Sequence, residues 1–528
     1  MTRSRRVAEP KPRRTPFPIS PRMFLRDSAT PRQAFMLLLA ASVCSAQTTG
    51  IGGVVIGASE VKQSSAAAQS KLEFASSDAR LVEGFNRAKR QAMAYVFDGD
   101  PVGPWYEAAE PGREAFCMRD TAHQAMGAHA LGLARHNLNM LRRFAEAVSD
   151  ARDWCSLWEI DRFNRPAPVD YQNDALFWFN LPANFDILDT CRRMYLWSGD
   201  PAYINDPAFL NFYDRTVTDY VERWGLAIDQ ILTRPRLLNM RGLPGGKKFQ
   251  SARGIPGYDE GNHEYTVGSD LVATQFAAYQ AYAQIQATRG NAALADAYFK
   301  KAEEVRKLID TRWWNEKDQC FYQRAGKDHN LEGGDSDNLL YWGAVADGPK
   351  LQAAMAGGGR RRVEVLYRYG DPDTARERLL QIMTPGQSRM EYPEVPFSTV
   401  GVVVNGTMGI DLDAASALLS SVQGGWVEAS VRTLSGLGTK VEWAELRNLP
   451  IRANEVTVRH EGTRKTIFTN QRGPAIVWYA AFAGTHESLL VNGKPVRART
   501  EKATLGRSIS SLRVTVGAGG TVTVAVPE

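Results

Sequence analysis

Two loops of this 528-residue chain combine carboxylic acids with aromatic and apolar residues. They are Gly257-Tyr258-Asp259-Glu260-Gly261-Asn262-His263-Glu264-Tyr265 and Arg389-Met390-Glu391-Tyr392-Pro393-Glu394-Val395-Pro396-Phe397. Burial raises the pKa of a carboxyl group, so a buried acid can keep its proton where an exposed one is ionised. A protonated and an ionised carboxyl held about 6.5–9.5 Å apart can hydrolyse a glycosidic bond by inversion. We therefore expect a catalytic pair formed by Glu264 and Glu391, with Glu260 and Glu394 as the alternatives.

Other polar residues in the loops could hold sugar hydroxyls. Arg119-Asp120 stands just before or at the start of a predicted helix, where the acid can accept from one hydroxyl and the guanidinium can donate to its neighbour. A helix-capping Asp with a surface Arg explains the same pair. The residues that we place at the substrate are Arg119, Asp120, His123, Asn173, Asp174, Trp178, Tyr258, Asp259, His263, Asp337 and Tyr392. For Asn173, Asp174 and Trp178, a helix cap and a core aromatic are the simpler interpretation.

The elements that position these loops are mostly helical between residues 80 and 425. Apolar residues recur at spacings of three and four, which predicts helices over 80–97, 121–147, 175–198, 208–227, 270–289, 293–312, 339–356 and 374–383. Loops rich in Gly, Pro, Asn and Asp separate them at 160–174, 233–269, 326–338 and 384–409. Long loops in a helical domain are more often functional than structural.

After residue 426 the pattern changes to short alternating or apolar runs, which predict strands at 455–461, 466–470, 475–482, 488–491, 511–516 and 520–526. Asn492-Gly493 is typical of a tight hairpin turn. We expect an all-α domain over 80–425 and a small antiparallel β-sandwich over 426–528. The sandwich is expected to support the helical domain more than to bind sugar. Residues 47–79 are rich in Ser, Ala, Gly and Gln and predict a linker or lead-in.

The N-terminus predicts export. Residues 34–46, AFMLLLAASVCSA, follow several arginines and end in small residues, as in a secretory signal, so residues 1–46 are expected to be removed and Met23 is a second possible start. The mature protein is then expected to be periplasmic or secreted, without a membrane anchor. Four cysteines remain, namely Cys117, Cys155, Cys191 and Cys320, and they fit either disulfides or buried thiols.

Composition excludes several classes of function. Residues 1–46 hold nine basic and two acidic residues, which leaves 55 basic and 56 acidic residues out of the totals of 64 and 58. A body near neutrality does not suit a nucleic-acid-binding protein. Motifs of serine hydrolases, phosphate-binding loops and zinc proteases are absent from the sequence, and its seven histidines are scattered. We expect no metal and no cofactor.

The helical region resembles the six-hairpin, or (α/α)6-toroid, glycosidases, which include glucoamylase, trehalase, processing α-glucosidases and α-L-rhamnosidases. Arg119-Asp120 is similar to the pair with which glucoamylases hold the terminal sugar. Further similar segments are Tyr195-Leu196-Trp197-Ser198-Gly199-Asp200-Pro201-Ala202-Tyr203, Trp313-Trp314-Asn315-Glu316 with Cys320-Phe321-Tyr322, and Tyr367-Arg368-Tyr369-Gly370. Their order along residues 80–425 matches that family better than any one of them does.

The resemblance implies an exo-acting, inverting enzyme on an oligo- or polysaccharide, with Glu264 as general acid and Glu391 as general base. The family usually has Asp at the acid position and tryptophans beside it, and this chain departs from both features, so Glu260 or Asp259 could be the acid. Two other functions fit the same loops. A polysaccharide lyase or sugar epimerase on the same toroid would use Tyr or His as a base, such as His263, Tyr258 or Tyr265. A non-catalytic carbohydrate-binding protein would use the acids only as hydrogen-bond partners.

Overall fold

The computed structural model describes residues 70–235, 253–259, 264–335, 337–357, 361–386, 389–413 and 430–528. Residues Lys62–Glu528 form one compact unit. The predicted signal segment and two of the candidate site residues, Glu260 and His263, lie outside the described residues. Among the described helices, none is long and apolar enough to cross a membrane.

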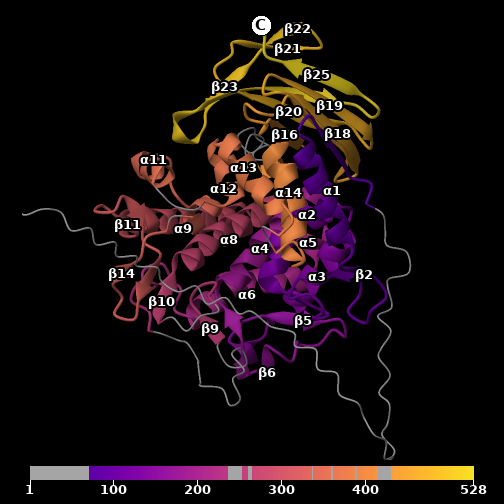
Figure 1. Cartoon of the computed structure of the whole chain (residues 1–528). Coiled ribbons are helices and arrows are strands. Elements are labelled where there is room, and N and C mark those ends of the chain that lie inside the picture. Colours follow the sequence, from indigo (N-terminus) through magenta and orange to yellow (C-terminus); the bar gives the residue numbers. More distant parts are fainter. Residues whose placement is uncertain are drawn as a thin grey trace, which may run out of the picture. The chain divides into compact units, whose positions relative to one another are not determined.

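Most predicted helices are present, and several of them are divided in two. The prediction is wrong in several places: α14 lies inside the segment 384–409 that we predicted as a loop, α12 was not predicted, and the predicted helix 175–198 begins only at Pro182, because residues 176–180 form strands. The segment 121–147 forms α2 and α3, and 208–227 forms α6 and α7, each pair broken by a short turn. The observed helices are α1 (Ala79–Met93), α2 (Met118–Ala130), α3 (Ala134–Glu146), α4 (Pro182–Ser198), α5 (Ala202–Asn205), α6 (Pro207–Val217), α7 (Asp219–Arg223), α8 (Ser269–Thr288), α9 (Ala292–Arg312), α10 (Asp337–Tyr341), α11 (Pro349–Ala356), α12 (Val363–Tyr369), α13 (Pro372–Met383) and α14 (Glu394–Val402), which continues as the π-helix η3 (Val403–Thr407) (Figure 1).

Burial separates central from peripheral helices. Helices α2, α4 and α8 are buried on most of their surface, and α8 packs against both α4 and α9. Helices α1 and α3 bury one face and expose the other, as amphipathic surface helices do. Such central helices, covered by amphipathic ones, are the arrangement that helical hairpins around a common centre would give.

Short strands that the sequence did not predict precede three of the central helices. They form the pairs β4 (Ala115–Cys117) with β5 (Glu159–Asp161), and β8 (Phe179–Asn180) with β9 (Arg253–Ile255), together with the sheet of β10 (Tyr265–Gly268), β13 (Arg324–Gly326) and β14 (Leu331–Glu332). The other pairs are β2 (Val96–Phe97) with β3 (Trp105–Tyr106), β6 (Tyr171–Asn173) with β7 (Leu176–Phe177), and β11 (Trp314–Asn315) with β12 (Cys320–Phe321). Because β4, β8 and β10 lead almost directly into α2, α4 and α8, the strand pairs fix the starts of these helices.

The C-terminal region contains two larger sheets. The seven-stranded sheet has the order β1-β17-β18-β19-β25-β21-β22, and the five-stranded sheet has the order β15-β16-β20-β24-β23. Their strands are β1 (Glu73–Ser76), β15 (Ile410–Asp411), β16 (Ser430–Leu434), β17 (Trp443–Ile451), β18 (Asn454–Glu461), β19 (Lys465–Arg472), β20 (Ile476–Ala483), β21 (Ser488–Val491), β22 (Lys494–Arg497), β23 (Arg499–Lys502), β24 (Ser508–Val516) and β25 (Thr521–Ala525). The buried rings of Phe468 in one sheet and Trp478 in the other stack at 5.0 Å, so the sheets share a core.

The expected purely antiparallel sandwich is wrong in one respect, because β16 and β20 run parallel. Two edge strands also come from outside residues 426–528. Strand β1, which lies in the segment that we predicted as a lead-in, pairs with β17, and β15 pairs with β16. The predicted hairpin turn is present, with positive φ angles of 47° at Asn492 and 81° at Gly493.

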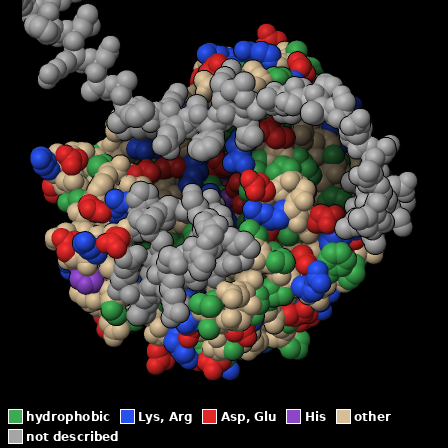
Figure 2. Space-filling view, turned by 60° about the horizontal axis from the view of Figure 1, so that its bottom comes forward, with side chains coloured by type: hydrophobic (Ala, Val, Ile, Leu, Met, Phe, Trp, Pro, Cys, Tyr) green, Lys and Arg blue, Asp and Glu red, His purple; other side chains and the backbone are tan. Residues whose placement is uncertain are grey.

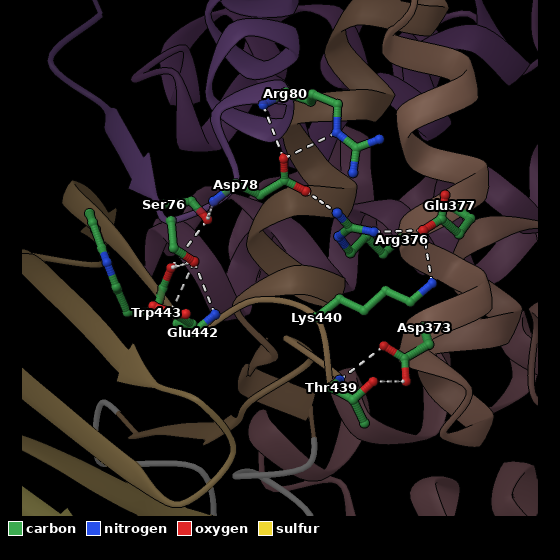
Figure 3. A network of polar contacts seen from close by, with 11 residues as sticks. Ser76, Asp78, Arg80, Asp373, Arg376, Glu377, Thr439, Lys440, Glu442 and Trp443 are labelled. Atoms are coloured by element: carbon green, nitrogen blue, oxygen red, sulfur yellow. Dashed lines mark hydrogen bonds and ion pairs between the residues drawn. The ribbon is translucent and has the colours of Figure 1, made fainter.

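Polar contacts join the helices to the seven-stranded sheet (Figure 3). Asp78 accepts from the backbone N–H of Arg80 at the start of α1 and pairs with the buried guanidinium of Arg376 in α13. Asp373, also in α13, accepts from the backbone and the hydroxyl of Thr439, both at 2.9 Å.

The four cysteines of the described residues are free thiols, of which Cys117, Cys155 and Cys191 are buried.

Candidate functional site

Many helices of the described region carry an acidic residue near their N-terminal end, and five of these acids concern the candidate site. These residues are Asp120 in α2, Asp186 in α4, Asp270 in α8, Asp337 in α10 and Glu394 in α14. All except Glu394 are buried, and the side chain of Glu394 is 25% exposed. The positive end of a helix dipole favours a negative charge within the first turn, where all of these acids except Asp186 lie.

Helix packing brings α2 and α14 into direct contact. A Cβ atom on Gly127 of α2 would lie 1.9 Å from the carbonyl oxygen of Phe397 in α14, so the two backbones cross in direct contact at this glycine. Gly401 of α14 also faces the backbone of Gly127. One turn before each crossing point lie His123 and Glu394, which the close approach places side by side.

His123 stands between two carboxylates. Its Nδ1 lies 2.7 Å from Oε1 of Glu394, and its Nε2 lies 3.6 Å from Oδ2 of Asp186. The same Oδ2 of Asp186 accepts a hydrogen bond of 2.9 Å from the hydroxyl of Tyr258. The contacts therefore run from α14 through α2 and α4 to the loop that begins at Tyr258.

Arg119 and Asp120 lie beside these contacts. The hydroxyl of Tyr392 donates to Oδ2 of Asp120 at 2.9 Å, and the guanidinium of Arg119 lies over the ring of Tyr258, 5.0 Å from its centroid. Met118, at the start of α2, donates its backbone N–H to the carbonyl of Trp158, so strands β4 and β5 hold this helix end in place. Two predicted substrate-binding residues are thus near two others, Tyr258 and Tyr392.

The environment moves the pKa values of Asp120 and Glu394 in opposite directions. Burial, reinforced by the charge of Glu394, raises the pKa of Asp120 to about 7. Burial opposes ionisation of Glu394 too, but the hydrogen bond and charge of His123, together with Arg119 and Arg362, lower its pKa to about 2. Carboxyl groups whose pKa values are driven apart are characteristic of acid and base assignments in active sites.

The remaining acids hold nearby loops. Asp270 accepts from the backbone N–H of Tyr258, and a Cβ atom on Gly257 would lie 2.8 Å from Asp270 Oδ1, so this loop lies closely against the start of α8. Asp337 accepts from the backbone N–H of Arg362 at 2.9 Å and pairs with its side chain at 3.1 Å. The guanidinium of Arg362 lies 4.7 Å from the ring centroid of Tyr341, whose ring is 6.1 Å from that of His123.

The two acids that the sequence favoured most lie in more open surroundings. The side chain of Glu264 is 53% exposed and pairs with Lys327 at 3.4 Å beside β10. Glu391 is exposed, and its backbone carbonyl accepts from the hydroxyl of Tyr95. Glu394, its alternative three residues later, is the acid of this loop that contacts His123.

Four other predicted residues make contacts close to their own positions in the sequence or to a neighbouring loop. Asn173 accepts from the backbone of Ala175 and Leu176, and Asp174 pairs with Arg152 at 2.6 Å. Trp178 is buried and donates to Asn180 at 2.8 Å. The backbone carbonyl of Asp259 accepts from the amide of Asn180 at 3.4 Å.

Sequence reasoning missed Asp186, Asp270, Tyr341 and Arg362. Asp186 and Asp270 occur as single acids near the starts of apolar helices, where they look like ordinary capping residues. An acid near a helix start does not by itself mark a site residue, since α7, α12 and α13 also have one in their first turn. In the described part of the chain, His, Cys, Asp and Glu side chains do not form a group of three or more that could bind a metal ion.

The space-filling view looks toward the side of the molecule where Figure 1 shows β5, β9 and β10 (Figure 2). The surface is hollowed there, and Asp and Glu, Lys and Arg, and hydrophobic side chains border the hollow. A surface that mixes charged and apolar groups can hold a polar ligand that also has apolar faces, as sugars do.

Comparisons with known proteins identify relatives only through structure. No protein-family model and no curated protein sequence matches this chain. The solved structure of α-L-rhamnosidase from Dictyoglumus thermophilum is similar with a TM-score of 0.54 and 10% identity, over 87% of this chain and 51% of that one. A family GH78 rhamnosidase of Bacillus sp. GL1 has a TM-score of 0.49 and 13% identity, over 76% of this chain and 40% of that one.

A putative kojibiose phosphorylase from the human microbiome has a TM-score of 0.48 and 10% identity, over 85% of this chain and 68% of that one. This chain spans about half the length of the α-L-rhamnosidase. The similarity to the α-L-rhamnosidase, at 10% identity, concerns the fold alone, and it agrees with the resemblance of the sequence to a group that includes α-L-rhamnosidases. The predicted resemblance is confirmed at the level of fold.

Proposed function

We propose that this protein is an exported glycoside hydrolase that cleaves its substrate with inversion, with Glu394 as the general base. The observation that carries the proposal is the state of Glu394, a partly exposed carboxylate with a pKa of about 2 that is held by His123 at the start of α14. An ionised carboxylate with an exposed edge can accept a proton from water as the water attacks the anomeric carbon.

The leaving oxygen needs a protonated acid on the opposite side of the sugar. We assign this role to a carboxyl group of residues 259–264, with Glu264 and Glu260 as the candidates. The loop starts at Tyr258, which contacts both Asp186 and Arg119, so it begins within reach of the base. In this arrangement Arg119 and Asp120 hold hydroxyls of the sugar ring between the acid and the base, and the substrate is an oligo- or polysaccharide attacked from its end.

Glu394 replaces Glu391 as the preferred base for a physical reason. A general base must be fixed so that its lone pair faces the water, and Glu394 is fixed by a 2.7 Å contact with His123. The exposed side chain of Glu391 lies on the same loop and offers a matched control. Glu394→Gln should lower kcat about 10²–10⁴-fold while sugar binding persists, since general base catalysis contributes about that much. Glu391→Gln should retain most of the activity.

The test starts from a panel of oligosaccharides and aryl glycosides, with NMR detection of the anomer first released. Inversion predicts a product of the anomeric configuration opposite to that of the substrate. Loss of activity in Glu391→Gln with full activity in Glu394→Gln would reverse the assignment. Glu264→Gln and Glu260→Gln identify the acid, because the variant that lacks it should still cleave substrates whose leaving group needs no proton, such as dinitrophenyl glycosides or glycosyl fluorides.

The lyase or epimerase alternative is weakened by the tyrosines of the site. A tyrosine that abstracts a proton works best with a lowered pKa, but burial raises the pKa of Tyr258, Tyr265 and Tyr392. A lyase would release an unsaturated product that absorbs ultraviolet light, which a hydrolase does not. A non-catalytic binding protein would bind saccharides from the panel and release no product.

A further inference from the structure

His123 has the most central position in the described site. Its side chain is 16% exposed, and its two nitrogens face Glu394 and Asp186 at 2.7 and 3.6 Å. The ring edge also meets two aromatic rings, those of Tyr258 at 6.5 Å and Tyr341 at 6.1 Å. The imidazole is thus enclosed by groups from α4, α10, α14 and the loop at Tyr258.

We propose that His123 is a positioning residue that holds the Glu394 carboxylate in its ionised form and in a fixed orientation, and that Asp186 acts on Glu394 only through His123. This inference rests on the proposed role of Glu394 as base. It assigns to the imidazole a task that is distinct from binding the sugar or from transferring a proton to it.

His123 bridges Glu394 and Asp186, and it is held more closely by Glu394 than by Asp186. Nδ1 is at full hydrogen-bond distance from Glu394, whereas Nε2 is 3.6 Å from Asp186, which is an electrostatic contact without a direct hydrogen bond. Oδ2 of Asp186 already accepts from the hydroxyl of Tyr258 at 2.9 Å. The ring is therefore bound tightly to Glu394 and supported from behind by a carboxylate that is itself anchored to the loop at Tyr258.

Other charged groups also lie near Glu394 and Asp186, and they limit the effect of His123 on the Glu394 carboxylate. Glu394 is near Arg119 and Asp120 from α2 and Arg362 from the segment before α12. Asp186 is buried and lies near Arg193 of its own helix, as well as near His123. The two arginines that act on Glu394 remain in a His123 variant, so the proposal predicts a partial loss of its stabilisation and not a complete one.

The test measures the pH dependence of kcat/KM for His123→Asn, which keeps a hydrogen-bond donor but has no charge. An opposite charge at this distance changes a carboxyl pKa by about 1–3 pH units, so the acidic limb of the profile should move upward by about that much. A fall in kcat with little change in KM should accompany it. His136→Asn is the matched control, because His136 also faces a carboxylate, Asp98 at 3.4 Å, in another part of the helical region.

Asp186→Asn supplies the second variant. Removal of the carboxylate that faces Nε2 leaves the ring held less firmly against Glu394, so the acidic limb should move in the same direction by a smaller amount. The double variant His123→Asn/Asp186→Asn should show no further displacement beyond His123→Asn alone, because Asp186 then has no ring to act through. Additive displacements in the double variant, or an acidic limb that stays in place in a folded His123→Asn protein, would overturn the proposal.

A readout without turnover separates this inference from the proposed function. The carboxyl ¹³C resonance of Glu394, assigned by its loss in Glu394→Gln, gives the pKa of the group directly. A rise of that pKa in His123→Asn, with no hydrolysis of any glycoside by the parent protein, supports the bridge and refutes the hydrolase. Hydrolysis with an unchanged Glu394 pKa in His123→Asn refutes the bridge alone. If His123→Asn does not fold, the same measurement on Asp186→Asn decides, and an unmoved Glu394 pKa there overturns the inference.

Discussion

Asp120 and Tyr392, 272 residues apart in the sequence, are joined by a hydrogen bond of 2.9 Å. The bond connects the first turn of α2 to the segment that leads into α14. Glu394 lies two residues after Tyr392. The hydrogen bond therefore also holds the carboxyl group of Asp120, whose pKa is raised, near that of Glu394, whose pKa is lowered. The candidate site thus depends on contacts between α2 and α14.

The raised pKa of Asp120 predicts a pH-dependent cost to stability. Asp120 keeps its proton in the folded protein up to about pH 7, whereas in the unfolded chain it loses it near its ordinary value of 3.8. The native state therefore binds more protons between these values, and stability falls as the pH rises through this window. Asp120→Asn removes that dependence. The stability of the variant relative to the parent protein should therefore be higher at pH 8 than at pH 4.

Urea unfolding midpoints at pH 4, 6 and 8 check this prediction. The exposed Asp229→Asn is the control and should alter the midpoints equally at each pH. A difference between Asp120→Asn and the parent protein that is the same at every pH would contradict the prediction, because Asp120 would then titrate alike in the folded and the unfolded protein.

The crossing of α2 and α14 predicts a strong effect of one methyl group. Gly127→Ala would place a Cβ atom 1.9 Å from the Phe397 carbonyl oxygen, so the helices must separate. Overpacking of this kind costs about 1–3 kcal/mol or more and here also moves Glu394 away from His123. The thermal unfolding temperature and kcat should both fall. Gly517→Ala, with no atom within 4 Å of the added group, is the control and should change neither. Full activity of Gly127→Ala would contradict the described crossing.

The contacts of Figure 3 predict that a buried and an exposed ion pair differ in energy. Arg376 is 5% exposed and pairs with Asp78, which is 9% exposed. Asp78→Asn leaves the guanidinium with less compensation and should cost about 3–5 kcal/mol. Lys440→Ala removes a pair with Glu377 whose partners are 56% and 46% exposed, and should cost about 1 kcal/mol or less. Equal unfolding free energies for the two variants would contradict this account.

His460 predicts acid sensitivity at the contact between the sheet and the helical region. Its Nε2 contacts the carbonyl of Met408 at 3.0 Å, its Nδ1 contacts the hydroxyl of Thr466 at 2.9 Å, and burial lowers its pKa to about 4. In the unfolded chain His460 takes up a proton near pH 6.5. The contribution of the buried, neutral His460 to stability is therefore fully present above that pH and is lost as the pH falls toward 4.

His460→Asn should weaken this dependence while lowering stability at pH 7 by about 1–3 kcal/mol, since the Met408 carbonyl loses its donor. The exposed His329→Asn is the matched control. Circular dichroism melts at pH 4.5 and 7 would contradict the prediction if the parent protein and His460→Asn lost equal stability on acidification.

Local patterns in the sequence were enough for most of the elements. Apolar spacing located α1, α8, α9 and α13 closely, and alternation located β18, β19 and β20. The short strands before α2, α4 and α8 were not predicted, because two to four residues give no period. The parallel pairing of β16 with β20 depends on strands that pair across distant parts of the chain, which a single sequence does not encode in any local pattern.

The site was only partly within reach of sequence reasoning. Residues 119–123 and the two loops were identified because several polar and aromatic residues stand close together in each. Glu394 was weighed only as an alternative to Glu391, since both are Glu residues among prolines and nothing local shows which one faces His123. That contact joins residues 271 positions apart and depends on the glycine at the helix crossing.

Strand β1 has a consequence for how the protein is made. Ser76 contacts Trp443, 367 residues later, so the first strand of the described residues has no partner until the chain is nearly complete. During that time it exposes an unpaired edge, which is a template for incorrect pairing. A ribosome-bound chain that stops before residue 443 should therefore be open to cleavage near residues 73–76, and release of the full chain should close that window.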